Sequence, residues 1–143
     1  MSVECNVYTE TKNTIFTKEE IREFIDKIMQ ELEQEGLVSV HRIKDEQMKK
    51  LNSEYRDKDE TTDVLSFAMN EGLEVKQKQK DLGDIFISIP QIKKQAQQRD
   101  INEKEELKRM LVHGVLHLLG YDHKEEEEAK KMFSQQEELI KKL

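Results

Sequence analysis

The segment Met110–Leu119 is apolar on nearly every side of a helix, and this feature constrains the fold more than any other. The apolar positions are Met110, Leu111, Val112, Val115, Leu116, Leu118 and Leu119. A helix that is hydrophobic all round is buried in the protein core. We therefore expect a central helix that is capped by Asn102 and Glu105, runs to about Leu119 and ends at Gly120.

One stripe of polar residues interrupts this apolar helix. It consists of Glu106, Arg109, His113 and His117. Residues three or four apart lie on the same face of a helix. A polar stripe on a buried helix needs a polar cleft or a metal ion to face, because burying unpartnered polar groups is costly. His113 and His117 are therefore candidate metal ligands.

A third histidine, His123, follows shortly after the helix. Gly120 can adopt the left-handed conformation that turns the chain sharply, which would bring His123 back toward His113 and His117. Three imidazole nitrogens at about 2.0–2.1 Å from a zinc ion leave a fourth position for water, as in catalytic zinc sites. We expect one such ion per chain, with another divalent metal left open. The alternative is a set of histidines hydrogen-bonded within the core.

The spacing H-x-x-x-H-x-x-G-x-x-H is also that of the metzincin proteases, but one residue departs from their pattern. Metzincins carry glutamate, the general base, directly after the first histidine. This chain has Gly114 there, which has no side chain to take a proton. Peptide hydrolysis is therefore the less favoured chemistry, since it would need a base from outside the motif.

Periodicity and capping signals predict the remaining elements. Strands are expected at 3–8, Leu37–Ile43, Val64–Ala68 and Leu82–Ile89; further helices are expected from the Thr17–Glu20 capping box to Gly36, at 45–55, from Pro90, and at 124–142. This pattern predicts an α+β fold and a single domain over 1–143. In it a four-stranded mixed sheet packs with about five helices. The metal site would lie on the central buried helix and the loop after it.

Charge, cysteine content and hydropathy limit the classes of protein. No apolar stretch reaches the roughly eighteen residues that cross a bilayer, and no signal peptide is visible. Cys5 is the only cysteine, so no internal disulfide is expected, which fits the cytoplasm. The net charge of −7 argues against a general nucleic-acid binder. A local basic rim is still possible, from Lys44, Lys49, Lys50, Arg56 and Lys58.

Three sequence blocks resemble a known family in the family's order. The segment His113–His123 closely resembles the signature H-G-x-L-H-L-x-G-Y-D-H of the YbeY-type endoribonucleases of bacteria. An upstream block and a middle block are also similar: Leu51-Asn52, Tyr55-Arg56, Lys58-Asp59 and Thr62–Phe67, then Leu82–Ile85 and Ile87-Ser88. Ala68 stands where the family is expected to have proline, which affects a strand end.

The resemblance implies a zinc-dependent endoribonuclease that is selective for single-stranded RNA. Such enzymes act in ribosomal RNA processing, notably 16S rRNA 3′-end maturation, and in ribosome quality control. The implied partners are the 16S precursor, the small ribosomal subunit and assembly factors. The family's metal ligands correspond to His113, His117 and His123, and its functional arginine to Arg56. His113 and Arg56 are thus the expected catalytic residues.

Several roles stay open at the level of sequence. Asp63 and Asp84 could each orient a histidine or cap a turn, and Asp122 could be a metal or water partner or a turn residue. Two other functions are alternatives: a metzincin-like peptide hydrolase, and a ribosome-assembly factor that does not cut RNA. The general base, the cleavage position and the oligomeric state do not follow from the sequence.

Overall fold

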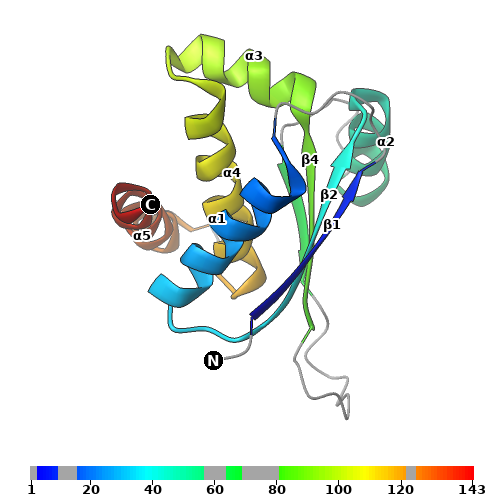
Figure 1. Ribbon diagram of the computed structural model, residues 1–143. Coiled ribbons are helices and arrows are strands. Elements are labelled where there is room, and N and C mark those ends of the chain that lie inside the picture. Colours follow the sequence, from blue (N-terminus) through cyan, green and yellow to red (C-terminus); the bar gives the residue numbers. More distant parts are fainter. Residues whose placement is uncertain (1–2, 10–15, 57–63, 69–80, 122–124) are drawn as a thin grey trace.

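The computed structural model describes residues 3–9, 16–56, 64–68, 81–121 and 125–143. Within these ranges the chain forms five helices and one four-stranded mixed sheet, which confirms the expected α+β fold (Figure 1). The elements are β1 (Val3–Thr9), α1 (Lys18–Glu31), β2 (Gly36–Ile43), α2 (Asp45–Arg56), β3 (Val64–Ala68), β4 (Asp81–Ser88), α3 (Ile89–Arg99), α4 (Glu103–Leu118) and α5 (Glu126–Lys142).

The strands lie in the order β1-β2-β4-β3. The strand β2 is parallel to both β1 and β4, while β3 is antiparallel to β4. In register, Ser39 lies beside Asp84 and Val40 beside Ile85. Successive side chains of a strand point to opposite faces of the sheet, so these two pairs lie on opposite faces.

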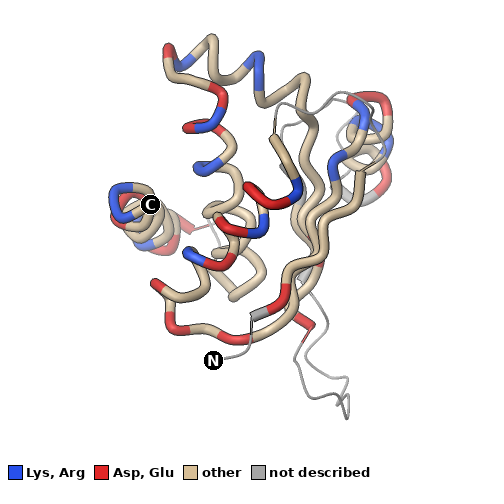
Figure 2. The backbone as a smooth tube through the Cα atoms, viewed as in Figure 1, with Lys and Arg blue, Asp and Glu red and all other residues tan. Residues whose placement is uncertain are grey.

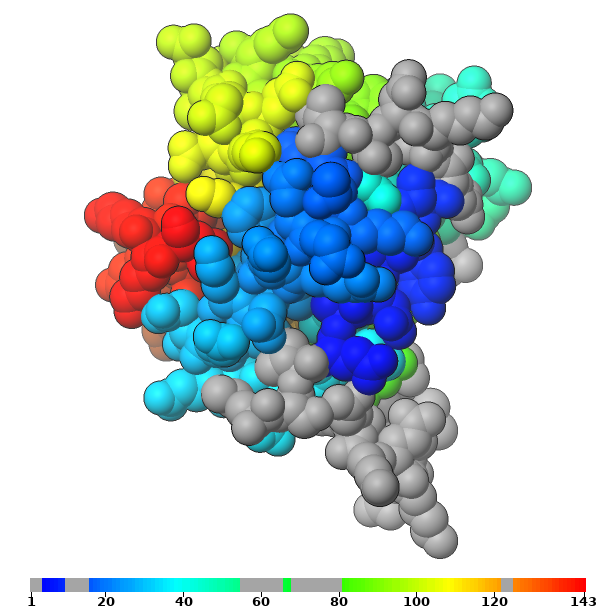
Figure 3. All heavy atoms as spheres, viewed as in Figure 1, coloured from blue at the N-terminus to red at the C-terminus, as the bar shows by residue number. Residues whose placement is uncertain are grey.

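Helices cover the two faces of the sheet unequally. The helices α1 and α4 pack on one face, α5 packs on α4, and α2 lies on the opposite face (Figure 1). The main core lies between the sheet and α1 and α4. A smaller cluster under α2 contains Ile43 and Met48, with Leu51, Phe67 and Phe86 packed against it. In the space-filling view, α1 covers most of the C-terminal half of α4, and α5 lies to its side (Figure 3).

The expected central helix is α4, and it is buried as its sequence predicts. Leu111, Val112, Val115 and Leu116 are fully buried in the main core. Gly114 faces β4 so closely that an added Cβ would lie 2.9 Å from Cδ1 of Ile85 and 3.1 Å from its Cγ2. Contacts under about 3 Å between carbon atoms are repulsive. Only glycine therefore lets the backbone of α4 approach β4 to this distance.

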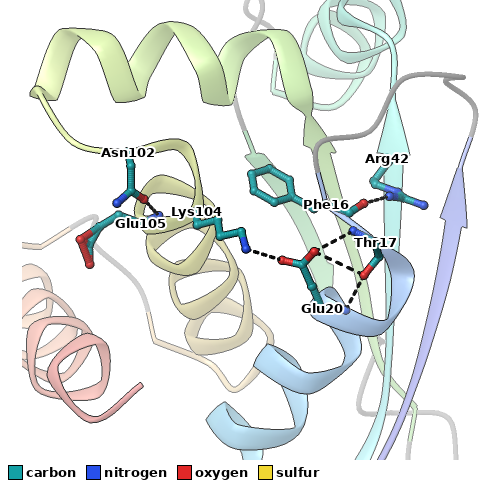
Figure 4. Close-up of polar contacts among 7 residues, drawn as sticks. All are labelled: Phe16, Thr17, Glu20, Arg42, Asn102, Lys104 and Glu105. Atoms are coloured by element: carbon teal, nitrogen blue, oxygen red, sulfur yellow. Dashed lines mark hydrogen bonds and ion pairs between the residues drawn. The ribbon is translucent and has the colours of Figure 1, made fainter.

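The N-terminal ends of α1 and α4 are tied together by side chains (Figure 4). The Thr17 hydroxyl accepts from the Glu20 N–H, and the Glu20 carboxylate accepts from the Thr17 N–H, which confirms the capping box. The Glu20 carboxylate also accepts from Lys104 Nζ at 3.2 Å. The hydrogen bond from Lys104 lowers the pKa of the Glu20 carboxyl below its usual value. The tie helps to hold α4 in place beside α1.

Several element boundaries differ from the expected ones. The helix α1 ends at Glu31, not at Gly36, which is instead the first residue of β2. Residue 56 is the last residue of α2, not the first of a loop, because the helix continues one residue further. Ile89 belongs to α3, because the Ser88 hydroxyl accepts from the Gln91 N–H and so begins the helix one residue earlier. The polar, Lys/Gln-rich segment 70–81, whose composition predicts a connection, lies outside the described residues except for Asp81, which is the first residue of β4. None of the helices described is long and apolar enough to span a membrane.

The contact between Gly114 and Ile85 gives the first testable prediction. Gly114→Ala would gain about 1 kcal/mol of helix propensity, but overpacking costs roughly 1–3 kcal/mol. We therefore expect the variant to have a lower free energy of unfolding than the wild type, measured by urea denaturation.

The matched control is the same substitution beside a smaller partner. Ile85→Val removes Cδ1, the atom of closest approach, so Gly114→Ala should cost less in the Ile85→Val background. A double-mutant cycle should give a favourable coupling of at least about 0.5 kcal/mol. Strictly additive costs would show that this contact does not set the distance between α4 and β4.

Candidate metal centre

The structure brings His113 and His117 together on one face of α4. Their Nε2 atoms are 3.1 Å apart, and their rings meet edge to face with centroids separated by 4.6 Å. Both residues are partly buried. The local reason is the helix itself, because residues four apart are neighbours on its surface. The predicted pairing of these two histidines is therefore confirmed.

The other ring nitrogen of His113 has a partner on α5. His113 Nδ1 lies 3.0 Å from Oε1 of Gln136, which is only 4% exposed. An amide oxygen can only accept a hydrogen bond, so His113 Nδ1 donates. A neutral imidazole carries a single ring proton, so Nε2 of His113 keeps its lone pair. That lone pair is directed toward the side of the ring on which His117 lies.

The donor set fits a divalent metal. Two nitrogens at 2.0–2.1 Å from a tetrahedral zinc ion lie about 3.3–3.4 Å apart. The observed 3.1 Å between the two Nε2 atoms is within a few tenths of an ångström of that separation. Metal-binding histidines usually donate their second ring N–H to an oxygen, which is the arrangement of His113 and Gln136. With His113 protonated at Nδ1, Nε2 of His117 is the donor of this contact, so His113 and His117 could hold a metal once the proton of His117 moves to its Nδ1.

All four members of the polar stripe on α4 have polar partners. Beyond the two histidines, Arg109 Nη2 lies 2.6 Å from Glu137 Oε1, and Glu106, which is fully buried, lies 3.5 Å from Arg99. Arg109 and His113 are one turn apart on α4, and they contact Glu137 and Gln136, which are consecutive residues of α5. The polar stripe is thus matched by α5 and α3, and the histidines lie at its C-terminal end.

Several predicted site residues lie outside the described part of the chain. His123, Asp63 and Asp122 are among them, so the third metal ligand stays a prediction. The backbone of Arg56 ends α2, but its side chain is also outside the description. Its expected place beside the metal cleft therefore stays a prediction. In the described residues, no group of three potential ligands comes together.

Asp84 does orient a histidine, but not one of the motif. Its Oδ1 lies 2.8 Å from Nε2 of His41, and both side chains are on the face of the sheet opposite α4. Ile85, the next residue, faces Gly114 on the α4 side, and neighbouring residues of a strand face opposite ways. The His41 ring also stacks between Tyr8 and Phe86, with centroids 4.9 and 4.3 Å away. Asp84 is thus remote from the paired histidines.

Gln136 is the site residue that sequence reasoning missed. The apolar stripe of α5 contains Met132 and Leu139, both buried, and Gln136 lies between them at helical spacing. A buried amide within an apolar stripe needs a hydrogen-bond partner. That break in the stripe is a signal in the sequence, although it does not reveal which residue is the partner.

Three lysines of the expected basic rim lie on α2 or just before it, but α2 also carries the acidic residues Asp45, Glu46 and Glu54. Lys44, which precedes the helix, and Lys49 and Lys50 within it are exposed. Figure 2 shows both basic and acidic positions on α2, which lies across the sheet from α4. The same figure shows acidic and basic residues mixed along α1. The basic rim, which also includes Arg56 and Lys58, therefore stays a prediction.

A single α+β unit with paired histidines on its most buried helix defines a candidate metal-dependent protein. Comparison with known proteins gives the family. The chain belongs to the YbeY family, because the family model described as Endoribonuclease YbeY matches residues 6–143. The family expected from the three sequence blocks is thereby confirmed.

Individual relatives agree with the family match. The chain is 41% identical over 129 residues to a protein named Endoribonuclease YbeY from Persephonella marina, covering 89% of this chain and 84% of that protein. It is 43% identical over 131 residues to the protein of the same name from Bacillus cereus, with 84% and 82% covered. A solution structure of a Thermotoga maritima protein matches with a TM-score of 0.66 and 28% identity, covering 95% of this chain and 86% of that one.

The position of Asp84 gives the second prediction. Asp84→Asn should leave metal content unchanged, because Asp84 contacts His41 on the far face of the sheet. Its side chain is 41% exposed, so we expect a loss of at most about 1 kcal/mol in the free energy of unfolding. Metal analysis of the purified variant checks this. A loss of metal as large as that of a His113 variant would place Asp84 in the metal centre.

Proposed function

We propose that this protein is a zinc-dependent endoribonuclease that cuts single-stranded RNA. The observation that carries the proposal is the 3.1 Å approach of the Nε2 atoms of His113 and His117. It occurs in a chain whose relatives are named endoribonucleases. Family membership supports the RNA substrate, and the histidine geometry supports the metal.

The ligands of the proposed ion are His113, His117 and His123. The first two come from adjacent turns of α4, which is fixed against β4 at Gly114. His123 follows Gly120, whose φ of +100° turns the chain at the end of the helix. A bound zinc ion would polarise a phosphoryl oxygen and lower the pKa of a bound water. The chain's own contribution is to hold the imidazoles in place, with His113 oriented by Gln136.

Arg56 is the proposed partner of the phosphate. Negative charge grows on the phosphoryl oxygens as the phosphodiester is cleaved, and a guanidinium can donate two parallel hydrogen bonds to such oxygens. Arg56 ends α2, the helix that carries the exposed Lys49 and Lys50. These lysines would add a sequence-independent attraction for the RNA backbone.

The proposed biological role is ribosomal RNA processing in the cytoplasm. We propose the 16S rRNA precursor as substrate, cut in maturation of its 3′ end, and the small ribosomal subunit with its assembly factors as partners. A contribution to ribosome quality control belongs to the same proposal. These finer assignments rest on the sequence resemblance of the three motif blocks.

The two alternatives differ in their support. A metzincin-like peptide hydrolase is disfavoured, because position 114 faces Ile85 so closely that the general-base glutamate of metzincins would not fit there without moving β4. A ribosome-assembly factor that binds without cutting keeps the same fold and the same histidines. Cleavage assays separate this second alternative from the enzyme.

The metal proposal gives the third prediction. The purified protein should cut an unstructured RNA, lose that activity when a chelator removes the metal, and regain it when zinc is added. His117→Ala should lose both metal and activity, because the remaining ligands no longer complete the site. Elemental analysis and gel-based RNA cleavage measure the two effects. Casein should stay intact.

Two results would contradict the proposal. Proteolysis that depends on metal, without any RNA cleavage, would favour the peptide hydrolase. Retention of the metal without cleavage of any RNA, including ribosomal precursor, would favour an assembly factor.

Arg56 gives the fourth prediction. Arg56→Ala should keep its metal and its fold, but cleavage at saturating RNA should fall by roughly 100- to 1000-fold, as for the loss of one transition-state donor. Arg56→Lys should recover little, because an ammonium cannot reproduce the planar fork of a guanidinium.

The matched control is Lys50→Ala, which removes another cation from α2. It should weaken RNA binding slightly and leave the rate at saturation nearly unchanged. If Arg56→Ala cuts RNA as fast as the wild type at saturation, Arg56 has no part in the chemical step.

A further inference from the structure

The packing of α5 on α4 contains a contact that the motif does not include. The amide of Gln136 meets His113, and the carboxylate of Glu137 meets Arg109. Two consecutive residues of one helix thus contact two residues that lie one turn apart on the other. The 2.6 Å ion pair of Arg109 and Glu137 holds the helices in the register that brings the amide to the imidazole.

The surroundings of Gln136 show that its amide is not there for packing alone. Its side chain is 4% exposed, and Met132 and Leu139, at helical spacing on either side of it, are buried and apolar. A leucine would fill such a position without burying a polar group, and burying an amide costs free energy unless it is hydrogen-bonded. The bond to His113 supplies that compensation. It also determines which ring nitrogen of His113 carries the proton.

We propose that Gln136 is a positioning residue of the metal centre, which holds His113 with its proton on Nδ1 and its Nε2 toward His117. This inference rests on the proposed function, in which His113 and His117 bind zinc. Free imidazole exchanges its proton between the two nitrogens, and only the form protonated at Nδ1 offers Nε2 to a metal. Gln136 therefore removes the competing tautomer and fixes the rotation of the ring before the metal arrives.

The contact also predicts which substitutions preserve the role. Glutamate at 136 has an acceptor oxygen at the same distance from the backbone, so Gln136→Glu should keep the tautomer and the metal. Leucine has no acceptor, so Gln136→Leu should no longer fix the tautomer or the ring rotation of His113, while it still packs beside Met132 and Leu139. Gln136→Asn keeps the amide but shortens the side chain by one methylene, so its oxygen should no longer reach Nδ1.

Gln135 offers the matched control. It is the preceding residue of α5, about 100° from Gln136 around the helix axis, and it lines a hollow of about 450 Å³ with Tyr121, Lys131 and Ser134. Gln135→Leu makes the same chemical change one residue away. It should alter neither the tautomer of His113 nor the affinity for zinc.

The experiment measures the tautomer and zinc affinity separately. Nitrogen-15 NMR of the metal-free protein identifies the protonated nitrogen of His113, and competition with a chromogenic chelator gives the Kd for zinc. In the wild type, Gln136→Glu and Gln135→Leu, we expect the proton on Nδ1 and tight binding. In Gln136→Leu and Gln136→Asn, we expect a mixture of tautomers and a Kd raised by about 10- to 100-fold.

The outcomes separate the positioning role of Gln136 from the existence of the metal centre. Wild-type protein with the His113 proton on Nε2, or a folded Gln136→Leu that binds zinc as tightly as the wild type, would overturn the role of Gln136. If Gln136→Leu does not fold, Gln136→Asn decides by the same two measurements. Wild-type protein that binds no zinc would refute the metal centre and, with it, the positioning of a ligand, whatever the tautomer of His113.

Discussion

The close contact of α4 with β4 at Gly114 is the constraint on which the rest of the site depends. An added Cβ there would lie 2.9 Å from Ile85, so this position must face the sheet and must be glycine. Adjacent helix residues are about 100° apart around the axis. With Gly114 facing β4, His113 is turned away from β4 and toward α5. The packing of an apolar core thus sets the direction of the paired imidazoles.

The helix α5 covers part of the core, and it also contacts the polar side of α4. Met132 and Leu139 bury apolar surface, while Gln136 and Glu137 contact His113 and Arg109. A metal centre needs ligands whose orientation is set before the metal binds. In this fold the sheet fixes the backbone of the histidine helix, and the last helix fixes the ring of His113.

The sequence predicts much of this structure because its local signals are consistent with each other. The apolar positions from Met110 to Leu119 predict the buried helix, and four-residue spacing predicts the pairing of His113 and His117. Contacts between segments that are distant in the sequence are harder to predict from it. Nothing near Gln136 or Asp84 in the sequence indicates that one meets His113 and the other His41, because such pairings depend on how α5 and β2 pack in three dimensions. The sequence shows that Gly114 cannot supply the metzincin base, but only the structure shows that it packs against Ile85.

In the proposed metal centre, His113 and His117 present their Nε2 atoms to one zinc ion. Anomalous diffraction at the zinc absorption edge, from crystals of the zinc-loaded protein, tests it most directly. We expect a single strong peak about 2.0–2.1 Å from both Nε2 atoms, with His113 Nδ1 still hydrogen-bonded to Gln136. A peak bound through Nδ1 of His113, or a zinc ion held elsewhere with the paired imidazoles still in mutual contact, would contradict it.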